Sequence, residues 1–179
     1  MPLSLALACA ASPSLAQVEN SGAQAIVLNA TLAESLTVNL SANAVNFNLT
    51  AGAALNPGST SLTATTAWVL RPGRAAVRVF AYFRSANAAL SDGAGNNIPS
   101  SAFQISDNGG LSRALTNALA FVAANAGLQL ANVLITSANR SGNRVDVMSF
   151  NIDLSAGTLP QLPAGVYTGT LNIRAQATL

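Results

Sequence analysis

The sequence has 179 residues, of which half are hydrophobic and only 8% are charged, and this length fits one domain. All eight basic residues are arginine, histidine is absent and the single cysteine is Cys9, so no Ser-His-acid triad, Cys-His pair or cysteine-rich metal site can be built. The net charge of +2 and the dispersed placing of Arg71, Arg74, Arg78 and Arg84 argue against a nucleic-acid-binding surface.

Residues 1–16 have the pattern of a secretory signal peptide, because an apolar run is followed by small residues at Ser14 and Ala16. Cleavage before Gln17 would leave a secreted mature chain that contains no cysteine. The alternatives are an ordinary buried apolar segment and lipidation at Cys9. The stretch is too short and too rich in Ala and Ser to predict a membrane span. We therefore expect a single secreted domain at 17–179 that begins with a flexible arm.

Alternation of apolar and polar residues predicts strands along much of the remaining chain. The first apolar row consists of Ile26, Leu28, Ala30 and Leu32. Shorter rows follow at 36–40 and 45–49, and turns separate them.

Residues 61–84 predict the clearest hairpin, with Pro72 and Gly73 in the positions that a type II turn requires. Its return strand has two faces, and the first, predicted to be the core face, consists of Val77, Val79, Ala81 and Phe83. Phe80 and Tyr82 then lie between arginines on the outer face. They are a candidate contact patch for a partner, unless a loop or the arginine side chains cover them.

Residues 98–106 predict a short strand, and 111–127 are ambiguous. Leucines at spacings of three and four, with Gly127 as a C-cap, predict a short helix at 111–127, and the competing interpretation is a long Ala-rich loop. A second hairpin is predicted from 128–138 and 144–154.

The last residues, 165–179, show the most regular alternation in the chain. One parity contains Tyr167, Leu171, Ile173 and Ala175, with Gly169 as the only gap. A row of this kind must be laid into a sheet, or its apolar side chains are left in water. The whole pattern predicts an all-β fold, an antiparallel immunoglobulin-like β-sandwich of about seven to nine short strands.

Two segments resemble secreted spore-coat-U-type and pilin-like domains. Residues 44–68 (AVNFNLTAGAALNPGSTSLTATTAW) are similar to that family's "VNFG" strand, Gly/Pro turn and Thr/Val-rich strand. Residues 162–179 (LPAGVYTGTLNIRAQATL) are similar to its closing "GTYTDTLTVTVTY". That family usually carries paired cysteines, which this chain lacks. The resemblance implies an immunoglobulin-like sandwich at a cell surface.

The function expected from these features is a non-catalytic structural subunit that forms a homo-oligomer or filament through strand pairing. The candidate assembly strands are the row Ile26–Leu32 and the row Tyr167–Ala175. The alternative is a monomeric extracellular module that binds a glycan or another small ligand. Catalysis is disfavoured because Asp146 and Asp153, the best acid/base pair, have odd spacing and face opposite sides of a strand. No cofactor, metal-ligand set or small-molecule substrate is identified.

Overall fold

The computed structural model describes residues 24–122 and 124–179, so the signal-peptide prediction for 1–16 lies outside the described part. The chain divides into two units, one ending at Leu32 and the other running from Ala33 to Leu179. In the first unit, residues 24–32 contain neither helix nor strand. The strand predicted at Ile26–Leu32 therefore does not form among the described residues of a single chain, and its role as an assembly strand stays a prediction.

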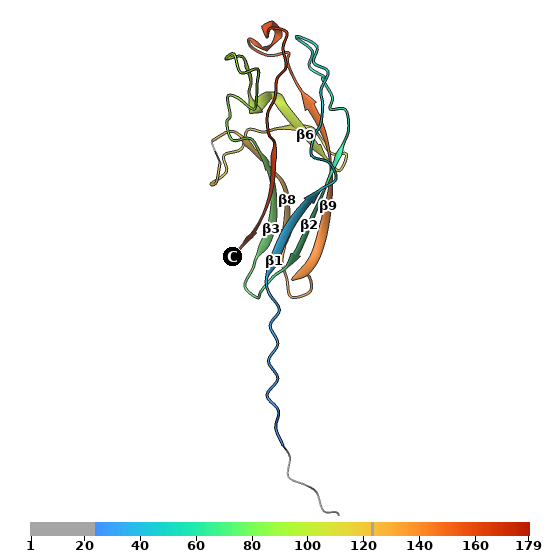
Figure 1. Cartoon of the computed structure of the whole chain (residues 1–179), viewed down its shortest axis with the longest axis vertical. Coiled ribbons are helices and arrows are strands. Elements are labelled where there is room, and N and C mark those ends of the chain that lie inside the picture. The colour runs from blue at the N-terminus through green and yellow to red at the C-terminus, as the bar shows by residue number, and fades with distance from the viewer. Residues whose placement is uncertain (1–23, 123) are drawn as a thin grey trace, which may run out of the picture. The chain divides into compact units, whose positions relative to one another are not determined.

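The second unit is an all-β antiparallel sandwich, as predicted (Figure 1). One sheet has the strand order β1 (Ser35–Leu40), β2 (Leu62–Val69), β9 (Ser141–Ile152), β6 (Phe103–Asp107) and β7 (Arg113–Ala114). The facing sheet has the order β10 (Asn172–Thr178), β3 (Ala76–Tyr82) and β8 (Gly127–Leu134). A small third sheet pairs β4 (Leu90–Ser91) with β5 (Asn97–Ile98), and short 3₁₀ turns lie at Ser100–Ala102 and Leu159–Gln161.

The core lies between the two larger sheets, and strand parity decides which side chains enter it. Alternate residues of β2 are buried, and the row predicted as the core face of β3, from Val77 to Phe83, is at most 3% exposed. The larger apolar cluster is filled by residues of both sheets, including Phe103, Met148 and Phe150. Trp68, Leu70 and Val77 form a second, smaller cluster. Trp68 is a core residue, and its Nε1 donates to the carbonyl oxygen of Asn139 at 2.9 Å.

Both predicted hairpins are wrong in their pairing, although their strands exist. β2 pairs with β9 and β3 pairs with β8, so the turn at 71–74 and the loop at 135–140 each cross from one sheet to the other. Gly73 has a φ of 94°, which suits the predicted turn. Leu70 and Val77, on either side of that turn, pack together between the sheets, and their burial favours the crossing.

The helix predicted at 111–127 is also wrong. The described residues of this segment form a loop that contains β7, and two backbone hydrogen bonds join Asn117 to Gly127. Gly127 starts β8 instead of capping a helix, and a Cβ there would lie within 2.3 Å of Leu119 Cδ1. The leucine spacing reflects separate contacts with the sandwich, since Leu115 is fully buried and Leu119 packs on the Gly127 backbone.

Two other predicted strands are shorter than expected. Residues 45–49 form only an isolated bridge, Phe47 with Gly58, and the regular strand at the C-terminus covers 172–178 instead of 165–179. Among residues 24–122 and 124–179, no helix has the length and apolar character needed to cross a membrane.

Candidate assembly groove

An apolar groove of about 680 Å³ runs between the segment that follows β1 and the segment that leads into β10. These segments, 40–49 and 165–173, are called here the two rims. The floor of the groove is made of buried core side chains: Leu62, Phe83, Phe103, Met148, Phe150 and Ile152. The groove is therefore an opening in the side of the sandwich that reaches its main core.

The apolar side chains of both rims are only half-buried. They pack against the core cluster but remain partly open to solvent: Ala42, Val45, Phe47, Leu49, Tyr167, Leu171 and Ile173. Inward-facing residues alternate along 45–49 and along 167–173. Among the described residues no strand covers these half-exposed inward rows.

The backbone of the 165–173 rim also carries unused groups. Thr168 exchanges two N–H···O bonds of 2.9 Å with Ser91 of β4. Because backbone groups alternate in direction along an extended segment, those of Tyr167 and Gly169 point the opposite way. Within the described residues they have no hydrogen-bond partner. A row of unpaired N–H and C=O groups is a template for an added strand.

Gly169 explains the only gap in the predicted C-terminal row. A Cβ at this position would lie 1.9 Å from the carbonyl oxygen of Ala89 and 3.2 Å from Leu90 Cα. The rim therefore passes against the backbone that enters β4, and only glycine allows that approach. This contact holds the rim beside the small β4–β5 sheet.

The described part of the N-terminal arm, residues 24–32, presents an exposed apolar row. Its large apolar side chains are 83% to 88% exposed: Ile26, Val27, Leu28 and Leu32. The row from Ile26 to Leu32 spans the same number of residues as the rim from Tyr167 to Ile173, roughly 23 Å when extended. An exposed apolar row of this length matches the groove in chemistry and in reach.

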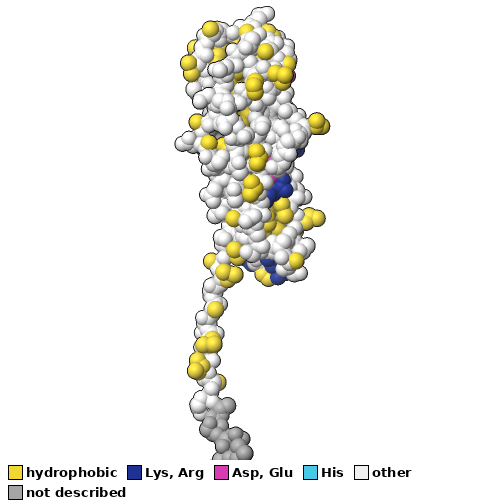
Figure 2. All heavy atoms as spheres, turned by 90° about the vertical axis from the view of Figure 1, so that its right-hand side faces the viewer, with side chains coloured by type: hydrophobic (Ala, Val, Ile, Leu, Met, Phe, Trp, Pro, Cys, Tyr) yellow, Lys and Arg dark blue, Asp and Glu magenta, His cyan; other side chains and the backbone are white. Residues whose placement is uncertain are grey.

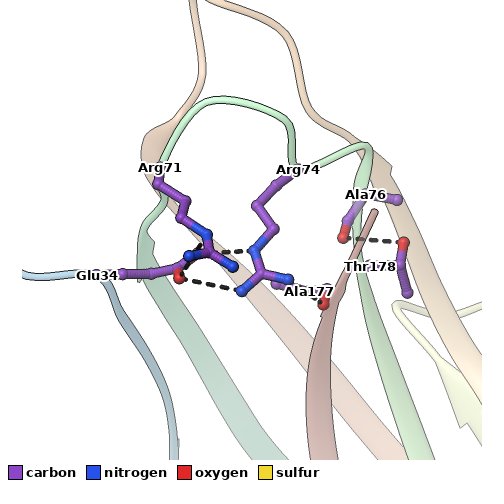
Figure 3. A network of polar contacts seen from close by, with 6 residues as sticks. All are labelled: Glu34, Arg71, Arg74, Ala76, Ala177 and Thr178. Carbon is purple, nitrogen blue, oxygen red and sulfur yellow. Dashed lines mark hydrogen bonds and ion pairs between the residues drawn. The ribbon is translucent and has the colours of Figure 1, made fainter.

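The start of β1 is tied down by an ionic clamp, shown in Figure 3. Arg74 donates from Nε and Nη2 to the two carboxylate oxygens of Glu34, at 2.8 and 3.0 Å. Arg71 Nε lies 3.6 Å from Glu34 Oε2, and Arg74 Nη1 donates to the Ala177 carbonyl at 3.5 Å. The hydrogen bond from Arg74 lowers the pKa of Glu34. The clamp fixes the first residues of the sandwich domain to the β2–β3 turn and the end of β10.

The predicted candidates separate into two groups. Tyr167, Leu171 and Ile173 line the groove, whereas Ala175 is half-buried in β10 beyond it. Phe80 is not available as a contact patch because it is 5% exposed, and Tyr82 is only half-buried.

Phe121, from the 111–127 loop, covers this predicted patch. Its ring packs edge-on against Phe80 and Tyr82 with centroids 5.4 Å apart in both pairs. Cover of Phe80 and Tyr82 by a loop was the predicted alternative to a contact patch, and the position of Phe121 confirms it.

A buried charged cluster was not predicted. Arg144 Nη2 lies 2.6 Å from Asp146 Oδ1, which is fully buried, and 3.8 Å from Asp107 Oδ2. Burial, followed by the negative charge of Asp146, raises the pKa of Asp107, while Arg144 and Arg113 lower it. By strand register the cluster lies between the two apolar clusters. Arg144, Asp146, Met148 and Phe150 share one parity of β9 and face inward. The sequence signal for the cluster was therefore two charged residues on the same parity as two core residues.

Within the described residues, no group of three His, Cys, Asp or Glu side chains could hold a metal ion. Asp153 has its own local partners, since Ser155 donates to it from the backbone N–H and from Oγ, at 2.9 and 2.6 Å. It lies beyond the end of β9 and away from the Arg144 cluster. What the described residues build is an apolar groove with unpaired backbone groups on its 165–173 rim. No protein-family model, curated protein or solved structure matches this chain.

Proposed function

We propose that the protein is a non-catalytic structural subunit, secreted to the cell surface, that assembles by strand donation. The arm row Ile26–Leu32 of one copy fills the groove of the next copy, and repetition of this contact builds a filament. The observation that carries the proposal is the presence, in one chain, of an open groove with one unpaired rim and of an exposed apolar row of matching length. The resemblance to pilin-like domains points the same way.

Both surface charge and geometry support repeated association. Figure 2 shows a face of the molecule on which neutral and apolar atoms predominate and charged ones are few, so charge repulsion between copies is weak. A head-to-tail contact between different surfaces, the arm and the groove, does not close on itself in a two-fold dimer and therefore extends into a chain.

The parity of the arm gives a direct test. Replacing Leu28 with Asp is expected to weaken self-association by at least about a hundredfold, because an unpaired carboxylate in an apolar groove costs several kcal/mol. Val27 is equally exposed, at 83% against 88%, but lies on the opposite parity, so Val27→Asp is the matched control. Light scattering and electron microscopy of both variants give the measurement.

The expected result is filaments or large oligomers for wild type and Val27→Asp, and monomers for Leu28→Asp. Equal assembly of the two variants would show that the arm does not enter a groove by its apolar row. A wild type that is monomeric, and that loses stability on Leu28→Asp, would mean that the arm fills the groove of its own chain.

A further inference from the structure

The outer face of the three-stranded sheet carries arginines and amides but no acidic residue. None of β3, β8 and β10 contains Asp or Glu. The strand registers place outward side chains in two neighbouring rows: Arg174, Phe80 and Gln129 in one, and Gln176, Arg78 and Asn132 in the next. Arg84 continues the outward parity of β3, and Arg113 of β7 lies at the β8 edge of this sheet, where its Nη1 donates to the Gln129 carbonyl at 3.1 Å.

Charge is segregated onto this face. Arg78, Arg84, Arg113 and Arg174 are all exposed, and none forms an ion pair with a carboxylate within residues 24–122 and 124–179. Their four charges exceed the net charge of the whole chain, which is +2, so the remainder of the protein is net negative.

The acids of the described chain are engaged elsewhere: Glu34 with Arg71 and Arg74, Asp107 and Asp146 with Arg144, and Asp92 and Asp153 with donors in their own loops. Within the described residues the four arginines therefore lack a directly paired carboxylate, and only Arg113 acts on an acid at longer range, since it lowers the pKa of Asp107.

Neutral neighbours hold two of these arginines in place without neutralising them. The guanidinium carbon of Arg174 lies 4.5 Å from the centre of the Phe121 ring, and Arg78 Nε donates to Asn132 Oδ1 at 3.4 Å. Each guanidinium keeps further N–H donors that can bind a carboxylate or sulfate in the fork geometry typical of arginine. We propose that this face binds an acidic polysaccharide, with the arginines pairing its anionic groups and the amides of Gln129, Asn132 and Gln176 bonding its hydroxyls.

The aromatic side chains favour a polysaccharide over a nucleic acid. Single-stranded nucleic acids bind by stacking bases on open aromatic rings. Here Phe80 is buried, and Phe121 packs on it and on Tyr82 while Arg174 covers its ring. The face therefore offers arginine cations, which can pair with anionic groups, and side-chain amides, which can bond hydroxyls. Among the described residues it offers no exposed aromatic ring on which a base could stack. The inference does not depend on strand donation, since the face is formed within one sandwich domain.

The experiment measures binding of the full-length protein to immobilised polygalacturonate and heparin at low and high salt. Arg78→Gln combined with Arg174→Gln should weaken binding about tenfold or more, since two charge-assisted contacts are lost. The double variant Arg78→Gln and Arg84→Gln should weaken polysaccharide binding by a similar factor. This variant leaves the Arg174–Phe121 contact intact. The control is Arg140→Gln, compared with the single variant Arg78→Gln, because Arg140 is an exposed arginine in the loop before β9 and outside this face. Thermal unfolding and light scattering on each variant check that fold and assembly are unchanged.

Binding that falls with salt, that both face variants weaken and that the control retains within about twofold would support the proposal. The proposal is overturned if the face variants and the control behave alike, or if neither polysaccharide binds at low salt. It is also overturned if a single-stranded oligonucleotide or phosphatidylglycerol vesicles bind more tightly than both polysaccharides.

Discussion

Replacing Arg144 with leucine is expected to lower the free energy of unfolding by about 3–5 kcal/mol near neutral pH. The guanidinium is the cation that faces both Asp146, which is fully buried, and Asp107. One oxygen of each carboxylate already lacks a hydrogen-bond partner among the described residues. Without Arg144, two like charges would remain in the interior between the sheets. Urea unfolding followed by tryptophan fluorescence measures the loss, because Trp68 is buried in the neighbouring cluster.

The pH dependence of this loss identifies its cause. A carboxyl whose folded-state pKa is raised, as for Asp107, binds its proton more readily when folded. Its contribution to stability is therefore greatest below the unfolded-state value of 3.8 and is lost as pH rises through the folded-state pKa. Since Arg144 lowers that pKa, the deficit of the variant should shrink as the pH falls from about 7 toward about 4.

Two controls separate charge from packing. Arg140→Leu, at an exposed arginine outside the cluster, should change stability by no more than about 0.5 kcal/mol. Adding Asp146→Asn to Arg144→Leu should restore part of the loss by removing one of the unpaired charges. A deficit that is independent of pH, or no larger than that of Arg140→Leu, would contradict the assigned role of Arg144.

Gly169→Ala is expected to cost about 3 kcal/mol or more of stability, because the new methyl group meets backbone and not a movable side chain. Its Cβ would lie 1.9 Å from the Ala89 carbonyl oxygen, so the groove rim must move away from β4. The paired hydrogen bonds between Ser91 and Thr168, one residue away, would be strained or broken by that movement. Thermal unfolding of the variant measures the effect.

Gly165 is the matched control on the same rim. A Cβ there would meet only side-chain atoms, at 3.8 Å and beyond, so Gly165→Ala should leave stability unchanged or raise it slightly. If the two alanine variants were equally stable, the close approach at Gly169 would not be a constraint on this fold. The comparison also tests whether displacing this rim impairs assembly in the way that the groove account requires.

Local patterns predicted most of the longer strands of the sandwich but not their partners. The inward row of β3 and the core position of Trp68 followed from parity and burial of large apolar side chains, and both are confirmed. Parity is the same whether a turn folds a strand back onto its neighbour or carries it across to the opposite sheet. The crossings at 71–74 and 135–140 are decided by packing of residues such as Leu70 and Val77, which local alternation does not report.

The groove was beyond prediction for the same reason. Its rims come from opposite ends of the sandwich sequence, 40–49 and 165–173, and it exists because no described strand fills the space between them. The sequence did single out Tyr167, Leu171 and Ile173, which line one rim. It could not show that the backbone of Tyr167 and Gly169 is unpaired among the described residues, since that depends on the pairing of Thr168 with Ser91.

The most direct measurement of strand donation supplies the arm as a separate peptide. Full-length Leu28→Asp protein, whose own arm is blocked, is titrated with a synthetic peptide of residues 24–33, and the melting temperature and binding heat are recorded. Saturable binding of one peptide per chain is predicted, with a stabilisation of about 2.7 kcal/mol when the peptide is at a hundred times its Kd. The same peptide carrying Leu28→Asp should have no effect. No binding of the wild-type peptide, or equal binding of both peptides, would contradict the account.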